Sequence, residues 1–596
     1  MESATMETAR KRIFGFAQLM DTLPLRSAVA RRAVWTLPWY GPAEAGPLQA
    51  ELARQRAFGA FAERADAHAL AHFKRHLEQT PDLQPTFRQL REERGALDDI
   101  QLFELKNWLL PMGESARFAR RSGIDLDPIP DLEAALDLLD PLKERLPSFY
   151  IYDCYDPQLP LLRRKLKAAV AAENGDGSSV GATTGSAGSC DGLDAAGMAG
   201  SAGRAGGPVA GSGNGAALCG GGSNQNPIPN ETVLFADRLE IEEKLAETER
   251  TVRTTLSRRL RDFLPELEAA LACFAAWDFL IAKTEWAQAH HCRCPEILTE
   301  TDEAASNADA DAPTPALAYT GLFYPPLFQQ CRAQGRPYQT VDIALYNDAC
   351  LLTGANMSGK TILLKALALA QTLAQFGFFV PAATARLTLF DEVCRIVGDE
   401  QNESRGLSSF GAEILALHEV LQQLRSKRRV LFLADELART TNPTEGSAIV
   451  CAFFNLWQHI RAEQTAHPDG FGSAALVSTH YETVDNAPRR LRVKGLDTAR
   501  WTEACRDRAT IIPGAEDDRT ADFLSQLQNF MDYGVEEVRA GAPAEMQALD
   551  VAACLGVDAE LIATARRYDH GADRCGHGTD GRNRPATPTA AKSQPA

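Results

Sequence analysis

Apolar residues recur at three- and four-residue intervals over much of the first half of the chain, which is the period of an amphipathic helix. The apolar residues of 98–111 follow this spacing, and those of 241–274 step by three, four or seven. Pro265 falls inside the second pattern and predicts a kink or a new helix start, because proline cannot continue a helix. We therefore expect a mostly helical region over 1–172 and a long helical arm over 230–298.

The pattern changes after about Leu317. Short apolar runs at 349–352, 430–434 and 474–477 alternate with longer helix-forming runs. Strands that are apolar throughout are buried on both faces, which is typical of a parallel α/β sheet covered by helices. After this region we expect helices again over 516–569.

Three segments contain too few apolar residues to form a core, being rich in Gly, Ala, Ser, Asp or Pro. The pattern thus predicts seven parts, which are a helical region (1–172), a disordered linker (173–229), a helical arm (230–298), an acidic loop (299–316), an α/β domain (317–515), a helical extension (516–569) and a disordered tail (570–596).

The strongest motif follows the first buried run. Gly, four residues and Gly-Lys-Thr form a P-loop pattern between a strand and a helix. Its glycines let backbone N–H groups point at phosphate oxygens, and the helix that follows adds its positive end. The motif predicts a nucleotide-phosphate site made of Gly354, Ala355, Asn356, Met357, Ser358, Gly359, Lys360 and Thr361. Lys360 would reach the β- and γ-phosphates, and the Thr361 hydroxyl would bind Mg²⁺.

Acidic residues and a histidine follow the next two buried runs. Asp435 and Glu436 come directly after 430–434, and His480 comes shortly after 474–477. Ligands bind outside the carboxyl ends of parallel strands. We therefore expect Asp435 to hold Mg²⁺, Glu436 to polarise the attacking water and His480 to sense the γ-phosphate.

These motifs together resemble the MutS-type ATPases of DNA mismatch repair. The resemblance is specific from about 317 to 567, and it rests on Asn356-Met357 in the P-loop, Ser408-Ser409-Phe410 with Glu413, Asp435-Glu436-Leu437-Ala438-Arg439, and Thr479-His480-Tyr481. It implies an ABC-type P-loop ATPase domain over 317–515, a helical lever and clamp region before it, and a dimerising extension over 516–569.

The resemblance also implies partners. A head-to-tail pair of ATPase domains, as a homodimer or a heterodimer, would aim the signature residues Ser408 and Ser409 of one protomer at the γ-phosphate bound by the other. ATP would close the dimer and hydrolysis would loosen it. The resemblance implies DNA as a partner, in mismatch repair or in recognition of repair and recombination structures.

Two differences from the family bear on mismatch recognition. The family reads mismatches with an inserted Phe followed by Glu; Phe61-Ala62-Glu63 has these letters but lies in an Ala-rich helical run, so we interpret it as packing. The segment after Arg439 carries Asn442-Pro443 where repair proteins usually have Ser-Thr. The alternative hypothesis is a MutS-like protein-remodelling ATPase without DNA binding, such as a reactivating factor for a cobalamin-dependent aminomutase.

Composition limits the nucleic-acid contact to a local patch. The chain has 62 Lys+Arg against 79 Asp+Glu and a net charge of −17, which excludes a histone-like wrapper of DNA. The best candidate for a DNA-facing patch is the group Arg253, Arg258, Arg259 and Arg261 on the helical arm.

Cysteine usage and hydropathy predict the compartment. The 13 cysteines are odd in number and irregularly spaced, which favours reduced thiols. No run reaches the ~18 apolar residues of a membrane span, and we find no secretory signal. We expect a protein without a membrane partner, located in the cytoplasm, or in the nucleus or an organelle if the source is eukaryotic.

Overall fold

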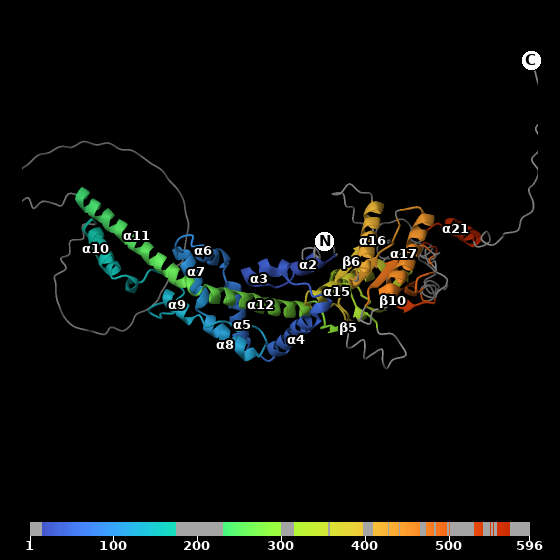
Figure 1. The fold of residues 1–596 in the computed structure, drawn as a ribbon, viewed down its shortest axis with the longest axis horizontal. Helices are drawn as coiled ribbons and strands as arrows, with labels where there is room; N and C mark the ends of the chain where they lie inside the picture. Colours follow the sequence, from blue (N-terminus) through green and yellow to red (C-terminus); the bar gives the residue numbers. More distant parts are fainter. Residues whose placement is uncertain are drawn as a thin grey trace, which may run out of the picture. The chain divides into compact units, whose positions relative to one another are not determined.

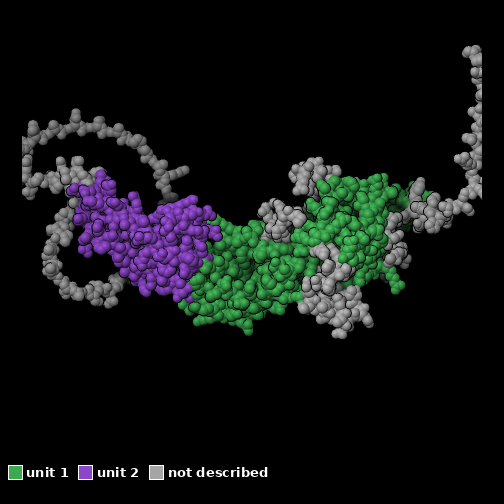
Figure 2. Space-filling view, viewed as in Figure 1, with its two compact units in different colours: residues 1–82, 114–130, 269–596 green, residues 83–113, 131–268 purple. Residues whose placement is uncertain are grey.

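The structure is a computed structural model of the chain. It describes residues 13, 15–173, 231–299, 315–355, 358–396, 409–426, 428–439, 441–464, 472–481, 484, 486–497, 500, 530–539, 549, 552 and 557–572. The predicted linker, acidic loop and tail therefore lie almost entirely outside the described residues. The chain divides into two compact units, which Figure 2 colours separately. Unit 1 comprises 1–82, 114–130 and 269–596, and unit 2 comprises 83–113 and 131–268.

Unit 2 is helical, as the periodicity predicts. Its helices are α6 (Gln84–Arg91), α7 (Asp99–Leu109), α9 (Glu133–Leu139), α10 (Gln158–Glu173) and α11 (Glu231–Arg261), with a short 3-10 turn η3 (Asp153–Tyr155). Asp98 and Gln101 form a reciprocal capping box that starts α7. Helix α10 lies beside α11 (Figure 1), and the Arg163 guanidinium bonds Glu249 across this contact at 3.0 Å.

A buried ion pair holds the centre of unit 2. The Lys106 ammonium on α7 lies 3.2 Å from the Asp140 carboxylate and 2.9 Å from the Tyr152 hydroxyl. The side chains of Lys106 and Asp140 are both 0% exposed. The backbone N–H of Arg145 donates a further bond to Asp140. A buried charge is tolerated only when it is paired and hydrogen-bonded in this way.

The helical arm is two helices. Helix α11 ends at Arg261 and α12 (Leu264–Ala289) begins three residues later. Pro265 occupies the first turn of α12, where its missing N–H would have had no partner in any case. The predicted new start at Pro265 is confirmed.

The N-terminal part of unit 1 is also helical. It contains α2 (Phe16–Asp21), α3 (Ala28–Ala33), η1 (Val34–Thr36), η2 (Pro42–Glu44), α4 (Ala45–Ala62), α5 (Ala67–Gln79) and α8 (Met112–Ser122, which begins at the boundary with unit 2). Phe61 lies near the end of α4, with its ring centroid 6.3 Å from that of Phe58 and 5.6 Å from that of Phe118. Phe61 is therefore a packing residue in this structure, in agreement with its helical sequence context.

Two sheets follow, as mixed α/β structure. The smaller has the order β1 (Glu296–Ile297), β5 (Thr384–Leu387), β2 (Leu317–Leu322), β3 (Val341–Leu345), with α14 (Pro325–Ala333) between β2 and β3 in the chain. The larger has six strands in the order β10 (Met531–Glu537), β9 (Arg489–Leu496), β4 (Ala349–Thr353), β8 (Ala474–Ser478), β7 (Val430–Ala434), β6 (Glu392–Ile396). All its neighbouring pairs are parallel except β10 with β9.

Helices cover both faces of the six-stranded sheet. Cys350 and Leu352 of β4 belong to the buried cluster that includes α15 (Lys360–Gln375). Ala349 and Leu351 point to the other face and belong to the cluster with α16 (Ser409–Arg425) and α17 (Pro443–Gln464). Successive side chains of a strand alternate between faces, so an uninterrupted apolar run requires two cores.

The prediction of helix throughout 516–569 is wrong for 531–537. These residues form β10, antiparallel to β9, and α21 (Ala559–Ala572) is the helix described after it. Met531, Tyr533 and Val535 fall at every second position, with Asp532, Gly534 and Glu536 between and after them, and this period of two was missed. Pairs such as Arg492 with Glu536, whose side chains lie 2.6 Å apart, stabilise the two strands across the ladder.

Within the described ranges, no helix is long and apolar enough to span a bilayer.

Candidate functional site

The glycines of the P-loop motif adopt backbone conformations that side chains would obstruct. Gly354 follows β4 with φ of 141°, and Gly359 caps α15 with φ of 94°. A Cβ on Gly354 would lie 2.8 Å from the Val493 carbonyl oxygen, and one on Gly359 would lie 3.0 Å from the Tyr533 ring. Both positions therefore require glycine. The loop brings the N-terminus of α15 to the carboxyl end of β4, where the helix end favours an anion.

Lys360 folds back over the loop. Its ammonium donates to the carbonyl oxygens of Gly354 at 2.7 Å and Ala355 at 3.0 Å, and the residue is 8% exposed. Burial lowers the pKa of Lys360, against the opposing attraction of Glu436 and Asp435. A buried cation held by neutral carbonyls would gain stabilisation from an incoming anion.

Ser358 carries an unsatisfied buried hydroxyl. The residue is 0% exposed, and among the described residues its Oγ has no hydrogen-bond partner. Buried hydroxyls are almost always bonded in native proteins. An unpaired hydroxyl next to a helix N-terminus fits a site for a phosphate oxygen.

The first residue after Lys360 meets the acidic end of β7. The Thr361 hydroxyl donates to Asp435 Oδ2 at 2.6 Å, although 74 residues separate the two in the chain. Ser478, at the end of β8, donates to the other oxygen of Asp435 at 2.8 Å. Carboxylate and hydroxyl oxygens are the ligands that Mg²⁺ prefers. The pair Thr361 and Asp435 therefore fits the predicted metal site.

Glu436 begins a turn with two left-handed residues. Its φ is 53° and that of Ala438 is 64°, a conformation that non-glycine residues rarely adopt. The Glu436 carboxylate accepts a bond from the Arg439 guanidinium at 2.9 Å. Glu413 of α16 accepts from the Ala438 N–H at 2.5 Å. The Tyr481 hydroxyl donates to the Ala438 carbonyl at 2.6 Å. The turn is thus held from two other elements, which is how strained backbone persists.

The other predicted residues are less fully defined. His480 is exposed just after β8, and its ring centroid lies 4.1 Å from that of Tyr481. Ser409 is the first residue of α16. Asn356, Met357 and Ser408 lie outside the described residues. The structure thus brings Thr361 to Asp435. The roles of all the predicted site residues in binding nucleotide and Mg²⁺ and in hydrolysis stay predictions.

A cavity of about 450 Å³ opens beside the P-loop. It is lined by the loop itself, by α15, by the 335–341 segment and by β10, including Gly359, Ile362, Tyr338 and Tyr533. This volume lies in the range of small-molecule sites, and an aromatic and aliphatic lining suits a flat ring. Sequence reasoning missed this cavity because its walls come from segments on both sides of the predicted site.

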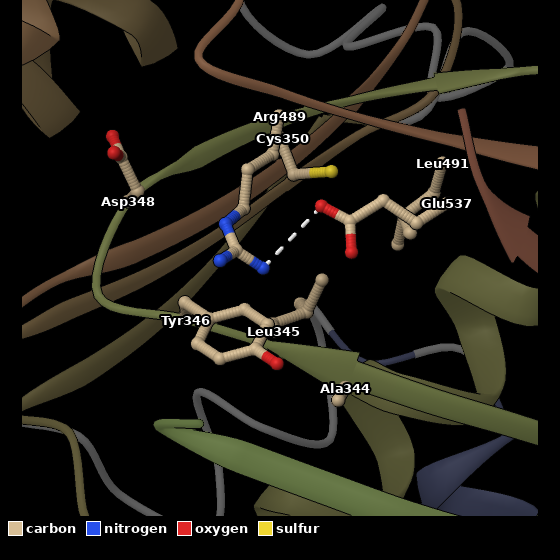
Figure 3. Close-up of a pocket in the computed structure, with 8 residues that line it drawn as sticks. All are labelled: Ala344, Leu345, Tyr346, Asp348, Cys350, Arg489, Leu491 and Glu537. Carbon is tan, nitrogen blue, oxygen red and sulfur yellow. Dashed lines mark ion pairs between the residues drawn. The ribbon is translucent and has the colours of Figure 1, made fainter. Parts of the chain in front are cut away.

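A second pocket lies at the opposite end of β4 and is a packing feature. Figure 3 shows the Arg489 side chain over the Tyr346 ring, with its guanidinium carbon 3.6 Å from the ring centroid and an ion pair to Glu537 at 3.5 Å. The pocket volume is about 20 Å³, room for about one water molecule. It borders Cys350 at the start of β4, whereas the P-loop follows the end of that strand.

Comparison with known proteins agrees with this geometry. Residues 350–513 match the family model described as MutS domain V. The C-terminal part of the chain is homologous to MutS proteins. The match contains the P-loop motif, the acidic pair and His480, and it does not include the helices that precede residue 350. The sequence resemblance to the MutS family is confirmed.

Named relatives match a larger share of the chain than this family model does. The chain is 28% identical over 345 residues to the Endonuclease MutS2 of Lacticaseibacillus casei, a match to 57% of this chain and 36% of the relative. It is 31% identical over 253 residues to the DNA mismatch repair protein MutS of Porphyromonas gingivalis, covering 42% of this chain and 26% of the relative. The chain thus spans only about a quarter to a third of the length of these relatives.

Proposed function

We propose that this MutS-related chain binds ATP with Mg²⁺ at the P-loop and hydrolyses it. The observation that carries the proposal is the bond between Thr361 and Asp435, because it joins the helix of the P-loop motif to the acidic strand end. The unpaired Ser358 hydroxyl and the buried Lys360 ammonium support the same reading. The adjacent cavity has the size and lining for the purine base.

Each residue has a role in this proposal. The loop N–H groups and Lys360 bind the phosphates, and Thr361 and Asp435 hold Mg²⁺. The bound metal would neutralise charge that develops on the phosphates. Glu436 orients the attacking water and polarises it, for which its carboxylate must leave Arg439. His480, two residues after the end of β8, would sense the γ-phosphate.

We further propose that turnover is coupled to DNA through a dimer of ATPase domains. The homologues named MutS and MutS2 support this choice of partner, since the first is described as a DNA mismatch repair protein and the second as an endonuclease. Ser408 and Ser409 of one protomer would complete the site of the other. Closure of the dimer when ATP binds would then change its affinity for DNA.

One observation favours the second candidate, a protein-remodelling ATPase without DNA binding. Two of the four arginines of the candidate DNA patch are used inside unit 2, because Arg253 bonds Asp99 at 2.7 Å and Arg261 bonds Glu93 at 2.7 Å. Arg258 and Arg259 remain exposed. Two exposed arginines can neutralise only a few DNA phosphates, so this patch would contribute little to DNA affinity.

The test is an ATPase assay with homoduplex, mismatched and branched DNA at several salt concentrations. DNA coupling predicts a changed ATPase rate and a binding affinity that falls steeply with salt. Replacing Arg258 and Arg259 by alanine should weaken DNA binding, while the same change at the exposed neighbours Arg120 and Arg121 on α8 is a charge-matched control. If DNA affects neither rate nor mobility at low salt, the DNA proposal is wrong. Co-purification with a protein client would then support the second candidate.

A further inference from the structure

Ser478 lies between the two acidic residues of the site and is bonded to both. It is the last residue of β8 and is 0% exposed. Its hydroxyl donates to Asp435 Oδ1 at 2.8 Å and accepts from the backbone N–H of Glu436 at 2.8 Å. One hydroxyl therefore uses its proton on the carboxylate and a lone pair on the neighbouring peptide.

The same residue also holds the next peptide through its backbone. The Leu437 N–H donates to the Ser478 carbonyl oxygen at 3.0 Å. Residues 436 and 438 are the left-handed positions of the turn, so the backbone between them must be held by outside partners. Three consecutive residues, Asp435 to Leu437, are thus attached to the end of one neighbouring strand.

We infer that Ser478 is a positioning residue that sets the Asp435 carboxylate for Mg²⁺ and the backbone of Glu436 for water activation. The inference rests on the proposed function, since it gives Ser478 a role towards the proposed metal. Ser478 Oγ occupies one oxygen of Asp435 and leaves the other, Oδ2, on the side of Thr361. Without this bond the carboxylate could rotate away from Thr361. Groups that orient a metal ligand typically change metal affinity or activity about 10–100-fold when removed.

The chain contains a matched control at the other end of the same strand. Ser473 precedes β8, is 7% exposed, and accepts from the Val430 N–H at 2.9 Å while donating to the Arg428 carbonyl oxygen at 3.3 Å. It makes the same number of hydrogen bonds as the Ser478 hydroxyl but touches neither acidic residue. Ser473→Ala therefore reports the structural cost of deleting a buried serine hydroxyl.

The experiment measures equilibrium binding of a fluorescent, non-hydrolysable ATP analogue to the full chain, with Mg²⁺ titrated and with EDTA. Ser478→Ala should raise the Mg²⁺ concentration at half-saturation about 10–100-fold and leave metal-free nucleotide binding unchanged. Ser478→Cys, which keeps the volume with a weak donor, should also raise it. Ser478→Thr should retain most of the wild-type response, and Ser473→Ala should retain all of it.

The outcomes separate this inference from the proposed function. Wild-type protein whose nucleotide binding ignores Mg²⁺ would overturn the proposed metal site itself. If nucleotide binding by Ser478→Ala and Ser478→Cys depends on Mg²⁺ in the same way as in the wild type, only the role of Ser478 is overturned. An equal loss in Ser473→Ala would also overturn it, because the effect would then be general destabilisation. In hydrolysis, the positioning role predicts a fall in kcat at saturating Mg²⁺ that Ser478→Thr restores.

Discussion

A buried lysine ties α12 to the far end of the P-loop helix, and its removal should be costly. The Lys283 ammonium is 3% exposed and lies 3.0 Å from the Glu51 carboxylate of α4. It also donates to the Phe376 carbonyl at 3.3 Å and lies 4.8 Å from the Phe378 ring centroid. Phe376 directly follows α15, so the lysine places its charge at the negative end of that helix.

Lys283→Met keeps the aliphatic stem and deletes the charge. Removing one partner of a buried ion pair costs about 3–5 kcal/mol, because the other charge stays buried and unpaired. We expect the lower end, about 3 kcal/mol, since Glu51 is 16% exposed and keeps Arg54 at 3.1 Å. At about 2 °C per kcal/mol for a large domain, the melting temperature should fall by roughly 6 °C.

The pH dependence follows from the pKa of Glu51. Burial would raise this pKa, but Lys283 and then Arg54 outweigh it, so the pKa lies below its ordinary value of 4.5. The ionised Glu51 carboxylate, paired with Lys283, therefore stabilises the folded protein fully above pH 4.5. This stabilisation is lost as pH falls through the lower pKa that Glu51 has in the folded state. Without Lys283 the pKa of Glu51 rises. The deficit of the variant should be largest near neutral pH, and it should disappear only as pH falls below 4.5, through the lowered Glu51 pKa of the wild type.

The assay is thermal unfolding of wild type and variant across this pH range, at low protein concentration because the isoelectric point is near 5.3. Lys74→Met is the matched control, since Lys74 pairs with Glu285 at 2.7 Å but both side chains are 28% exposed. An exposed pair contributes under about 1 kcal/mol. A Lys283→Met shift no larger than that of Lys74→Met would refute the reasoning.

Three further substitutions test the site. Lys360→Ala should abolish nucleotide binding, measured by retention of a radiolabelled adenine nucleotide with magnesium; unchanged retention would contradict its phosphate role. Glu436→Gln should preserve ATP binding, slow hydrolysis about 10²–10⁴-fold and trap a closed dimer in size-exclusion chromatography, whereas normal turnover would show that another group activates the water. Gly446→Ala should destabilise the protein by about 1–3 kcal/mol in a thermal melt, because the new Cβ meets the Tyr481 hydroxyl that holds the Ala438 turn; an unchanged melt would mean that Tyr481 yields without cost.

Local signals in the sequence were sufficient for the helices and the central strands. Each of these signals acts between residues that are close in the chain, as do the capping residue Asp98, the apolar periodicity of the arm and Pro265. Their effect on the helices can therefore be predicted from the sequence alone. The uninterrupted apolar runs of β4, β7 and β8 required cores on both faces, which the α/β sheet provides. Strand β10 was missed because its apolar residues Met531, Tyr533 and Val535 form only a short pattern with a period of two, and because the strand gains its stability from β9.

The chain order by itself predicted which residues would bind phosphate, because the spacing of glycines, Lys360 and Thr361 is set within one loop. The chain order could not show which residues from other segments hydrogen-bond to these site residues. Asp435 meets Thr361, and Ser478 bridges Asp435 and Glu436, only because parallel strands far apart in the chain end at one edge of a sheet. Hydrogen bonds between residues so far apart in the chain leave no repeating pattern in the sequence. The bonds that orient Asp435 and Glu436 could therefore be identified only from the tertiary structure.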